Sequence, residues 1–202
     1  MRKAMVFIDY ENFDIARQEL YKPDYAPRLD FPSFPLKLCK KISTDLDLIK
    51  TFLFIPKPDS YLMQQEWRKK RYVFLKGLEN INYFSVIEGR HCVRPASGGF
   101  DTIDIRKKDT YYVNEKGTDI NITAQLLTKA FHNSYDTAIV ISGDTDYIPV
   151  FDLINTLGKT VISVGVEGQN LQRFRTHTDR QYTLYRDFLD ECVQKKESEE
   201  RA

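Results

Sequence analysis

The stretch VISGDTDYIP, residues 140–149, has the pattern of a buried strand that turns directly into a helix. Ser142 and Gly143 permit a tight turn, and the carboxylates of Asp144 and Asp146 follow it. In open α/β sheets, ligands bind at the edge formed by the carboxyl ends of the strands. One aspartate at such a junction is explained as a helix cap, whereas two favour a binding role. The stretch therefore predicts an α/β fold with two acidic side chains at its functional edge.

Other apolar runs repeat this strand-like character on both sides of that stretch. Segments of helical length separate most of them, and a helix near 36–43 follows a proline-rich loop. This alternation predicts a mostly parallel sheet with helices on both faces. Residues 90–114 break the alternation, because an SGG turn precedes alternating residues typical of an antiparallel excursion. The expected strands are 3–9, 48–56, 81–89, 137–144 and 159–165, and the expected helices are 10–20, 59–80, 119–133 and 147–157.

Length and composition indicate one globular domain. The chain has 202 residues, of which 42% are hydrophobic and 29% charged, so we expect a domain at 1–186 and a charged tail at 187–202. No run has the length of a membrane span or the pattern of a signal peptide, which predicts a cytoplasmic protein. Three widely separated cysteines favour reduced thiols. With a net charge of only +1, attraction to a polyanion must come from a local basic face.

Two further junctions present acidic side chains. The strand 3–9 ends at Asp9, with Asn12 about one helical turn later, and Asp119 follows a Gly-Thr turn at the start of a helix. Each is explained singly as a turn or cap residue, but three such junctions together favour a shared site. If the strands ending at Asp9 and Asp144 are parallel neighbours, their carboxylates repel unless a cation joins them. Ligands that are all oxygen suit Mg²⁺ or Mn²⁺ rather than zinc.

Three ordered motifs carry a family resemblance. FIDYEN at 7–12, EKGTDINI at 115–122 and SGDTDYIPV at 142–150 resemble those of the NYN domain family, which includes LabA-like proteins within the PIN-like nuclease superfamily. The resemblance spans roughly 3–186. It implies a PIN-like, Rossmannoid sheet, RNA processing, and an acidic metal site formed by Asp9, Asp119, Asp144 and Asp146 beside Asn12.

The resemblance predicts metal-dependent hydrolysis of RNA phosphodiester bonds, with single-stranded DNA as an alternative substrate and products carrying 5′-phosphate and 3′-hydroxyl ends. Bound metal would lower the pKa of a water and stabilise charge on the phosphate. Many family members carry a further Asp where this chain has Gln125, so one metal is expected more firmly than two. The sequence leaves self-association open. Substrate contacts are expected from Asn12, Lys116, Ser142, Thr145, Arg68, Arg71, Arg173 and Arg175. Tyr111, Tyr112 or Tyr147 could stack on unpaired bases if exposed, but aromatic residues more often belong to the core.

Two alternatives stay open. The first is an inactive module of the same fold that binds RNA or protein, with Gln125 as the sign of a weakened centre. The second is an Asp-based phosphatase, because GDTD imitates a metal-binding motif. Such enzymes use a nucleophilic Asp followed two residues later by an acid, and the FIDYEN setting of Asp9 and Glu11 fits that pattern poorly. The histidines 91, 132 and 177 show no mutual spacing, and structural or surface roles are expected for them.

Overall fold

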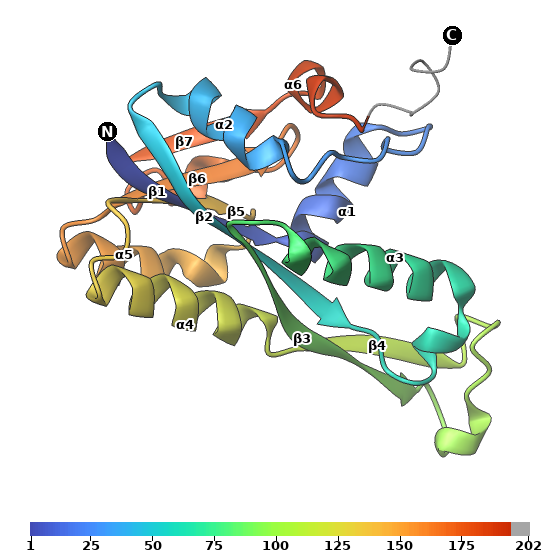
Figure 1. The fold of residues 1–202 in the computed structure, drawn as a ribbon. Coiled ribbons are helices and arrows are strands. Elements are labelled where there is room, and N and C mark those ends of the chain that lie inside the picture. Colours follow the sequence, from blue (N-terminus) through green and yellow to red (C-terminus); the bar gives the residue numbers. More distant parts are fainter. Residues whose placement is uncertain (195–202) are drawn as a thin grey trace, which may run out of the picture.

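A seven-stranded sheet runs through residues 1–194, which the computed structural model describes (Figure 1). The strand order is β4-β3-β2-β1-β5-β6-β7, and every neighbouring pair is parallel except β3 with β4. The predicted mostly parallel α/β sheet with an antiparallel excursion is confirmed. The strands are β1 (Arg2–Asp9), β2 (Leu46–Lys57), β3 (Phe84–Pro95), β4 (Tyr111–Lys116), β5 (Thr137–Ile141), β6 (Thr160–Val166) and β7 (Arg180–Leu184).

Helices cover both faces of the sheet, as the alternation predicts (Figure 1). β1 is apolar on both sides: Val6 and Ile8 belong to the core under one layer of helices, and Met5 and Phe7 to the core under the other. A central strand of a parallel sheet needs this double burial. One layer holds α1 (Tyr10–Leu20), α2 (Phe34–Ile42), α3 (Glu66–Gly77) and α6 (Arg186–Glu191); the other holds α4 (Thr118–Phe131) and α5 (Ile148–Thr156).

Several boundaries differ from those expected. The helix expected at 59–80 is divided into α3 and short 3₁₀ helices on either side, and the strand expected at 81–89 begins at Phe84 and extends to Pro95. The stretch 102–110 forms turns rather than a strand, because Asp104 and Thr110 bind the backbone within it. β7 was not expected, since RQYTL is short and half polar. The 3₁₀ helices are Leu62–Gln64, Leu78–Asn80, Phe100–Thr102, Thr145–Tyr147 and Leu171–Phe174.

The C-terminal segment begins as a helix that packs on the domain. α6 buries Phe188 and Leu189 in the core, and Cys192 follows them. At the domain boundary expected at residue 186, the chain is therefore still packed against the sheet. The division into a domain and a tail stays a prediction. The rest of the expected tail, residues 195–202, lies outside the described residues. Cys39, Cys92 and Cys192 are unpaired thiols. No helix within residues 1–194 combines the length and apolarity that a membrane span requires.

Candidate functional site

The site is built at the carboxyl ends of β1 and β5, which are parallel neighbours. β1 also pairs with β2, so the chain leaves β1 toward one side of the sheet and later returns to its other side at β5. This is the switch point at which open α/β sheets bind ligands. Asp9 is the last residue of β1, and Ser142 directly follows β5. The neighbouring strands expected from the sequence are confirmed.

Asp9 is a buried carboxylate with only 6% of its surface exposed. Its Oδ2 accepts a hydrogen bond from Ser142 Oγ at 3.0 Å and lies 3.3 Å from the Tyr147 hydroxyl, while its Oδ1 caps α1 through Asn12 N. Burial raises the pKa of Asp9 to about 6, and the Asp119 charge adds to this rise against the hydrogen bonds. A carboxylate in this position is stabilised by a proton or by a cation.

The Tyr147 hydroxyl joins two of the acidic side chains. It donates to Asp119 Oδ1 at 2.9 Å and lies against Asp9, although Asp119 belongs to α4 and Asp9 to β1. Burial raises the pKa of Tyr147 well above its usual value, and the charges of Asp9, Asp119 and Asp144 raise it further. Two of the four predicted aspartates therefore contact one hydroxyl group, and Asp144 lies near enough for its charge to act on it. Tyr147 is 1% exposed, so its expected role in stacking on bases is wrong; Tyr111 is buried as well.

The turn after β5 holds the remaining predicted residues. Asp144 Oδ1 accepts from Asp146 N at 3.0 Å, so Asp144 also serves as the cap, and Asp146 itself is exposed. Asn12 Oδ1 accepts from Gly143 N at 2.8 Å and from Gln169 Nε2 at 3.0 Å. Asn12 thus ties α1 to this turn and keeps its amide nitrogen as a donor. Thr145 lies half-buried in the same turn.

These residues fit a hard divalent cation by their chemistry. Asp9 and Asp119 contact the same hydroxyl, and Asp144 and Asp146 follow β5, so the set supplies only oxygen donors, which Mg²⁺ and Mn²⁺ prefer. Within residues 1–194, no three of these aspartates have ligand atoms within 4.8 Å of one another, so an ion would have to draw them together. Gln125, in the helix α4 that carries Asp119, is half-buried and adds no charge. The four aspartates and Asn12 stay the predicted metal-binding and catalytic residues.

A model of the NYN domain matches residues 3–185. The chain belongs to the NYN domain family. It therefore has the fold of a PIN-like nuclease family, and the predicted resemblance is confirmed. Among solved structures, it is similar to a protein of unknown function, VPA0982, from Vibrio parahaemolyticus, with 17% sequence identity and a TM-score of 0.57. The likeness covers 93% of this chain and 96% of that one, and it shows the fold alone. No curated protein matches the sequence.

The predicted basic residues of this NYN domain occupy different places. Arg71 Nη2 binds Asp14 Oδ2 at 2.6 Å, so its guanidinium is held beside α1. Arg68 lies over the Trp67 ring and donates its Nε to Gln65 Oε1 at 2.7 Å. Lys116 is exposed at the end of β4, three residues before Asp119, while Arg173 and Arg175 are exposed beyond β6. Lys116 is therefore the predicted cation nearest in the chain to the acidic side chains.

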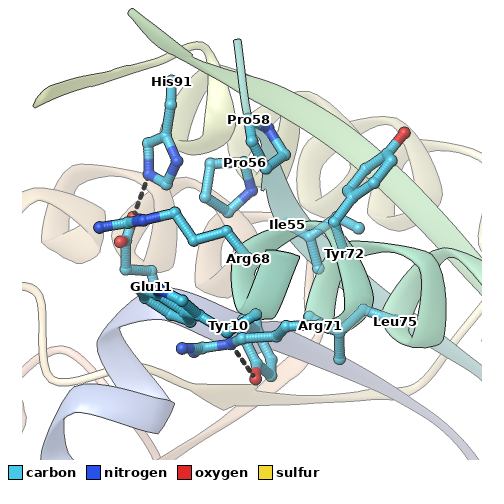
Figure 2. Close-up of a pocket in the computed structure, with 11 residues that line it drawn as sticks. Tyr10, Glu11, Ile55, Pro56, Pro58, Arg68, Arg71, Tyr72, Leu75 and His91 are labelled. Carbon is cyan, nitrogen blue, oxygen red and sulfur yellow. Dashed lines mark hydrogen bonds and ion pairs between the residues drawn. The ribbon is translucent and has the colours of Figure 1, made fainter. Parts of the chain in front are cut away.

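A cavity of about 60 Å³ opens between α1, α3 and the end of β2 (Figure 2). Its lining combines the aromatic ring of Tyr10 with Arg68 and Arg71, and Glu11 and His91 form one wall. Figure 2 shows the imidazole of His91 pointing at the Glu11 carboxylate, at 3.0 Å between Nε2 and Oε2. No pattern in the sequence connects Glu11 with His91, because the two residues are 80 positions apart and lie on different elements.

Glu115 joins this pair from β4. One ligand atom each of Glu11, His91 and Glu115 lies within 4.8 Å of the others, and no other such trio of histidine, cysteine or acidic side chains occurs in the described part of the chain. Although Glu115 as a whole is exposed, partial desolvation of its carboxyl group raises its pKa to about 8, and the Glu11 carboxyl adds to the rise. Burial also opposes ionisation of Glu11, but its contacts with His91 and Glu115 and the charge of Arg71 together outweigh this effect and lower its pKa to about 2.

Replacing Tyr147 by phenylalanine tests how the two carboxylates are held. Loss of the hydroxyl removes the donor between Asp9 and Asp119 and keeps the ring packed on Phe151. We expect a loss of about 1 to 2 kcal/mol in the free energy of unfolding, measured by urea denaturation at neutral pH without metal. Tyr112→Phe, at an exposed position, is the control and should leave it unchanged. Equal stability of both variants would contradict the bridging role.

Proposed function

We propose that this NYN domain is a metal-dependent ribonuclease that hydrolyses phosphodiester bonds at the carboxyl ends of β1 and β5. The observation that carries the proposal is the contact of both Asp9 and Asp119 with the Tyr147 hydroxyl at the switch point of the sheet, where Asp144 follows β5. A stable core by itself does not require a buried carboxylate whose pKa is raised to about 6, placed beside a second carboxylate. Membership of the family supports the same chemistry.

The residues of the chain have separate roles in this proposal. Asp9 and Asp119 hold Mg²⁺ or Mn²⁺ with Asp144, and the exposed Asp146 completes the set from the same turn. The cation, when bound, lowers the pKa of a water and neutralises charge on the phosphate oxygens. Ser142 and Tyr147 fix the orientation of Asp9 through their hydroxyl groups. Asn12 offers its amide nitrogen to a phosphate oxygen, because its carbonyl is occupied by Gly143 and Gln169.

The substrate is proposed to lie along the edge that carries Lys116. Lys116 stands opposite Arg90 in the register of β3 and β4, and both side chains are exposed. Two cationic side chains therefore lie beside the start of α4, which carries Asp119. Such cations attract any phosphate backbone and give cleavage that weakens with salt. RNA is the proposed polymer because of the family, with single-stranded DNA as the alternative. Arg173, Arg175 and Thr145 stay predicted contacts.

Cleavage of a mixed panel of RNAs and single-stranded DNAs tests the proposal. The wild type should cut RNA with Mg²⁺ or Mn²⁺ and lose this activity in excess chelator. Asp119→Asn should lower the rate at least about 100-fold, since even outer-shell changes at metal sites cost 10- to 100-fold. Asp109→Asn, an exposed acid in the turn before β4, should cut at the wild-type rate. Product ends are identified by phosphatase and ligase treatment, with 5′-phosphate expected.

Three results would contradict the proposal. RNA that is bound but left intact with both metals would favour a binding module of the same fold. Turnover of a small phosphomonoester without any action on polynucleotides would favour a phosphatase. Equal cleavage by the wild type and Asp119→Asn would show that the activity belongs to a contaminant.

A further inference from the structure

The cluster of Glu11, His91 and Glu115 differs in chemistry from the aspartate centre. It contains an imidazole, and its three side chains come from α1, β3 and β4. His91 and Glu115 stand directly opposite each other in the antiparallel register of β3 and β4, so their side chains share one face of the sheet. Glu11 reaches them from the first turn of α1, two residues after the end of β1. The strand pairing and the helix therefore hold the three groups together.

The histidine ring is fixed in place and buried. Its side chain is 8% exposed, its Nε2 lies 3.0 Å from Glu11, and its Nδ1 has no hydrogen-bond partner in the described residues. The imidazole thus has its one polar contact inside the cluster. A ring held in this way loses little freedom when it binds a ligand through Nε2. Burying an imidazole whose Nδ1 has no hydrogen-bond partner costs free energy, and packing alone does not explain why the ring is placed here.

The charges of the cluster favour a cation. Two carboxyl groups lie near one imidazole, and Asp9 adds a further negative charge that acts on Glu115. Arg71 also acts on Glu11, but its guanidinium is bound to Asp14 and Tyr10. Closely placed carboxyl groups share a proton or bind a metal ion, since both cannot ionise freely. Arg68 lines the same cavity and donates its Nε to Gln65.

We propose that Glu11, His91 and Glu115 form a second metal site that binds a divalent transition ion of the Zn²⁺ and Co²⁺ class in preference to Mg²⁺. Imidazole and carboxylate together are ligands of such ions, whereas Mg²⁺ prefers oxygen alone. An ion about 2.0 to 2.2 Å from each ligand needs donor atoms closer than 4.8 Å, and the exposed Glu115 can move inward to provide this. Three protein ligands leave a coordination position open toward the cavity in Figure 2, which Glu11 and His91 line.

The site stands apart from the nuclease proposal, since neither its ligands nor its preferred ion are those of the aspartate centre. Its test therefore measures binding and uses no substrate. Metal-free protein is titrated with Co²⁺ in millimolar Mg²⁺, which is present to occupy the aspartates. We expect one Co²⁺ per chain by equilibrium dialysis, a visible absorption band typical of nitrogen and oxygen ligands, and displacement by Zn²⁺.

Variants assign the bound ion to its ligands. Glu115→Gln should weaken Co²⁺ binding at least about tenfold, and its exposed position makes misfolding a minor concern. Glu11→Gln should have the same effect. Glu19→Gln, an exposed glutamate on the same helix α1, is the matched control and should bind as the wild type does. Asp144→Asn should lose RNA cleavage and keep Co²⁺ binding, which separates the two proposals.

Three results would overturn the inference. Unchanged Co²⁺ affinity in both Glu115→Gln and Glu11→Gln would place the ion elsewhere. A strong thiolate charge-transfer band would assign it to a cysteine such as the half-buried Cys92. No binding to the wild type would mean that a proton alone holds the carboxyl groups together.

Discussion

Asp9→Asn is expected to abolish metal-dependent cleavage and, at the same time, to stabilise the metal-free protein. Asparagine keeps an acceptor for Ser142 and Tyr147 but carries no charge for a cation. Loss of a direct ligand should lower the cleavage rate at least about 100-fold. The stabilisation follows from burial, which makes the charged form of Asp9 costly.

The stabilisation should depend on pH in a defined direction. Because the pKa of Asp9 is about 6 in the folded protein and about 4 in an unfolded chain, the folded state binds the proton more tightly. Stability that is fully present below pH 4 is therefore lost as the pH rises through 6. Two pKa units correspond to roughly 3 kcal/mol, so Asp9→Asn should gain up to about that amount at neutral pH.

Urea denaturation between pH 4 and 8, without metal, measures this effect. The wild type should lose stability across this range relative to Asp9→Asn. Asp119→Asn is the matched control, because Asp119 is exposed: it should lose cleavage without the gain in stability. Adding Mg²⁺ should raise the melting temperature of the wild type and not that of Asp9→Asn. If the curves of the two proteins stay parallel at all pH values, burial does not set the pKa of Asp9.

Gly89→Ala is expected to damage the fold and the site together. Gly89 lies in β3 where α4 begins, and an added Cβ would stand 2.2 Å from Thr118 Oγ1 and 2.9 Å from Thr118 N. Neither atom can move freely, because Thr118 is buried and Asn121 binds the carbonyl of Glu88 next to the glycine. The start of α4, with Asp119, must therefore shift away from β3. Such overpacking costs about 1 to 3 kcal/mol.

Denaturation and cleavage assays on the same samples measure both consequences. Gly77→Ala is the control, since an added Cβ there meets nothing within 4 Å and the backbone is helical. It should be neutral or slightly stabilising. Thr118→Ala removes the atom nearest to the added Cβ. The double variant Gly89→Ala/Thr118→Ala should therefore lose less stability than the sum of the losses in the two single variants. Additive effects would show that the contact with Thr118 does not limit the position of α4.

The sequence by itself determined the sheet and where its acidic residues end up. β1 and β5 are apolar enough to be buried on both faces, and parallel strands put their carboxyl ends at one edge. Asp9 and Asp144 therefore lie at the same edge once the two strands pair. Two short segments were not predicted correctly, β7 and the turns at 102–110. Their sequences lack a clear hydrophobic period, because few of their residues are buried.

The tertiary structure alone decided which side chains from distant elements touch. Tyr147 had the pattern of an aromatic residue available to stack on bases, yet the start of α5 turns its hydroxyl inward between Asp9 and Asp119. His91 and Glu115 carry no local signal, and only the antiparallel register of β3 and β4 places them opposite each other. Periodicity fixes the face on which a residue lies, because it reflects local geometry. Contacts between elements depend on strand order, register and rotamers, which are set by packing over the whole chain.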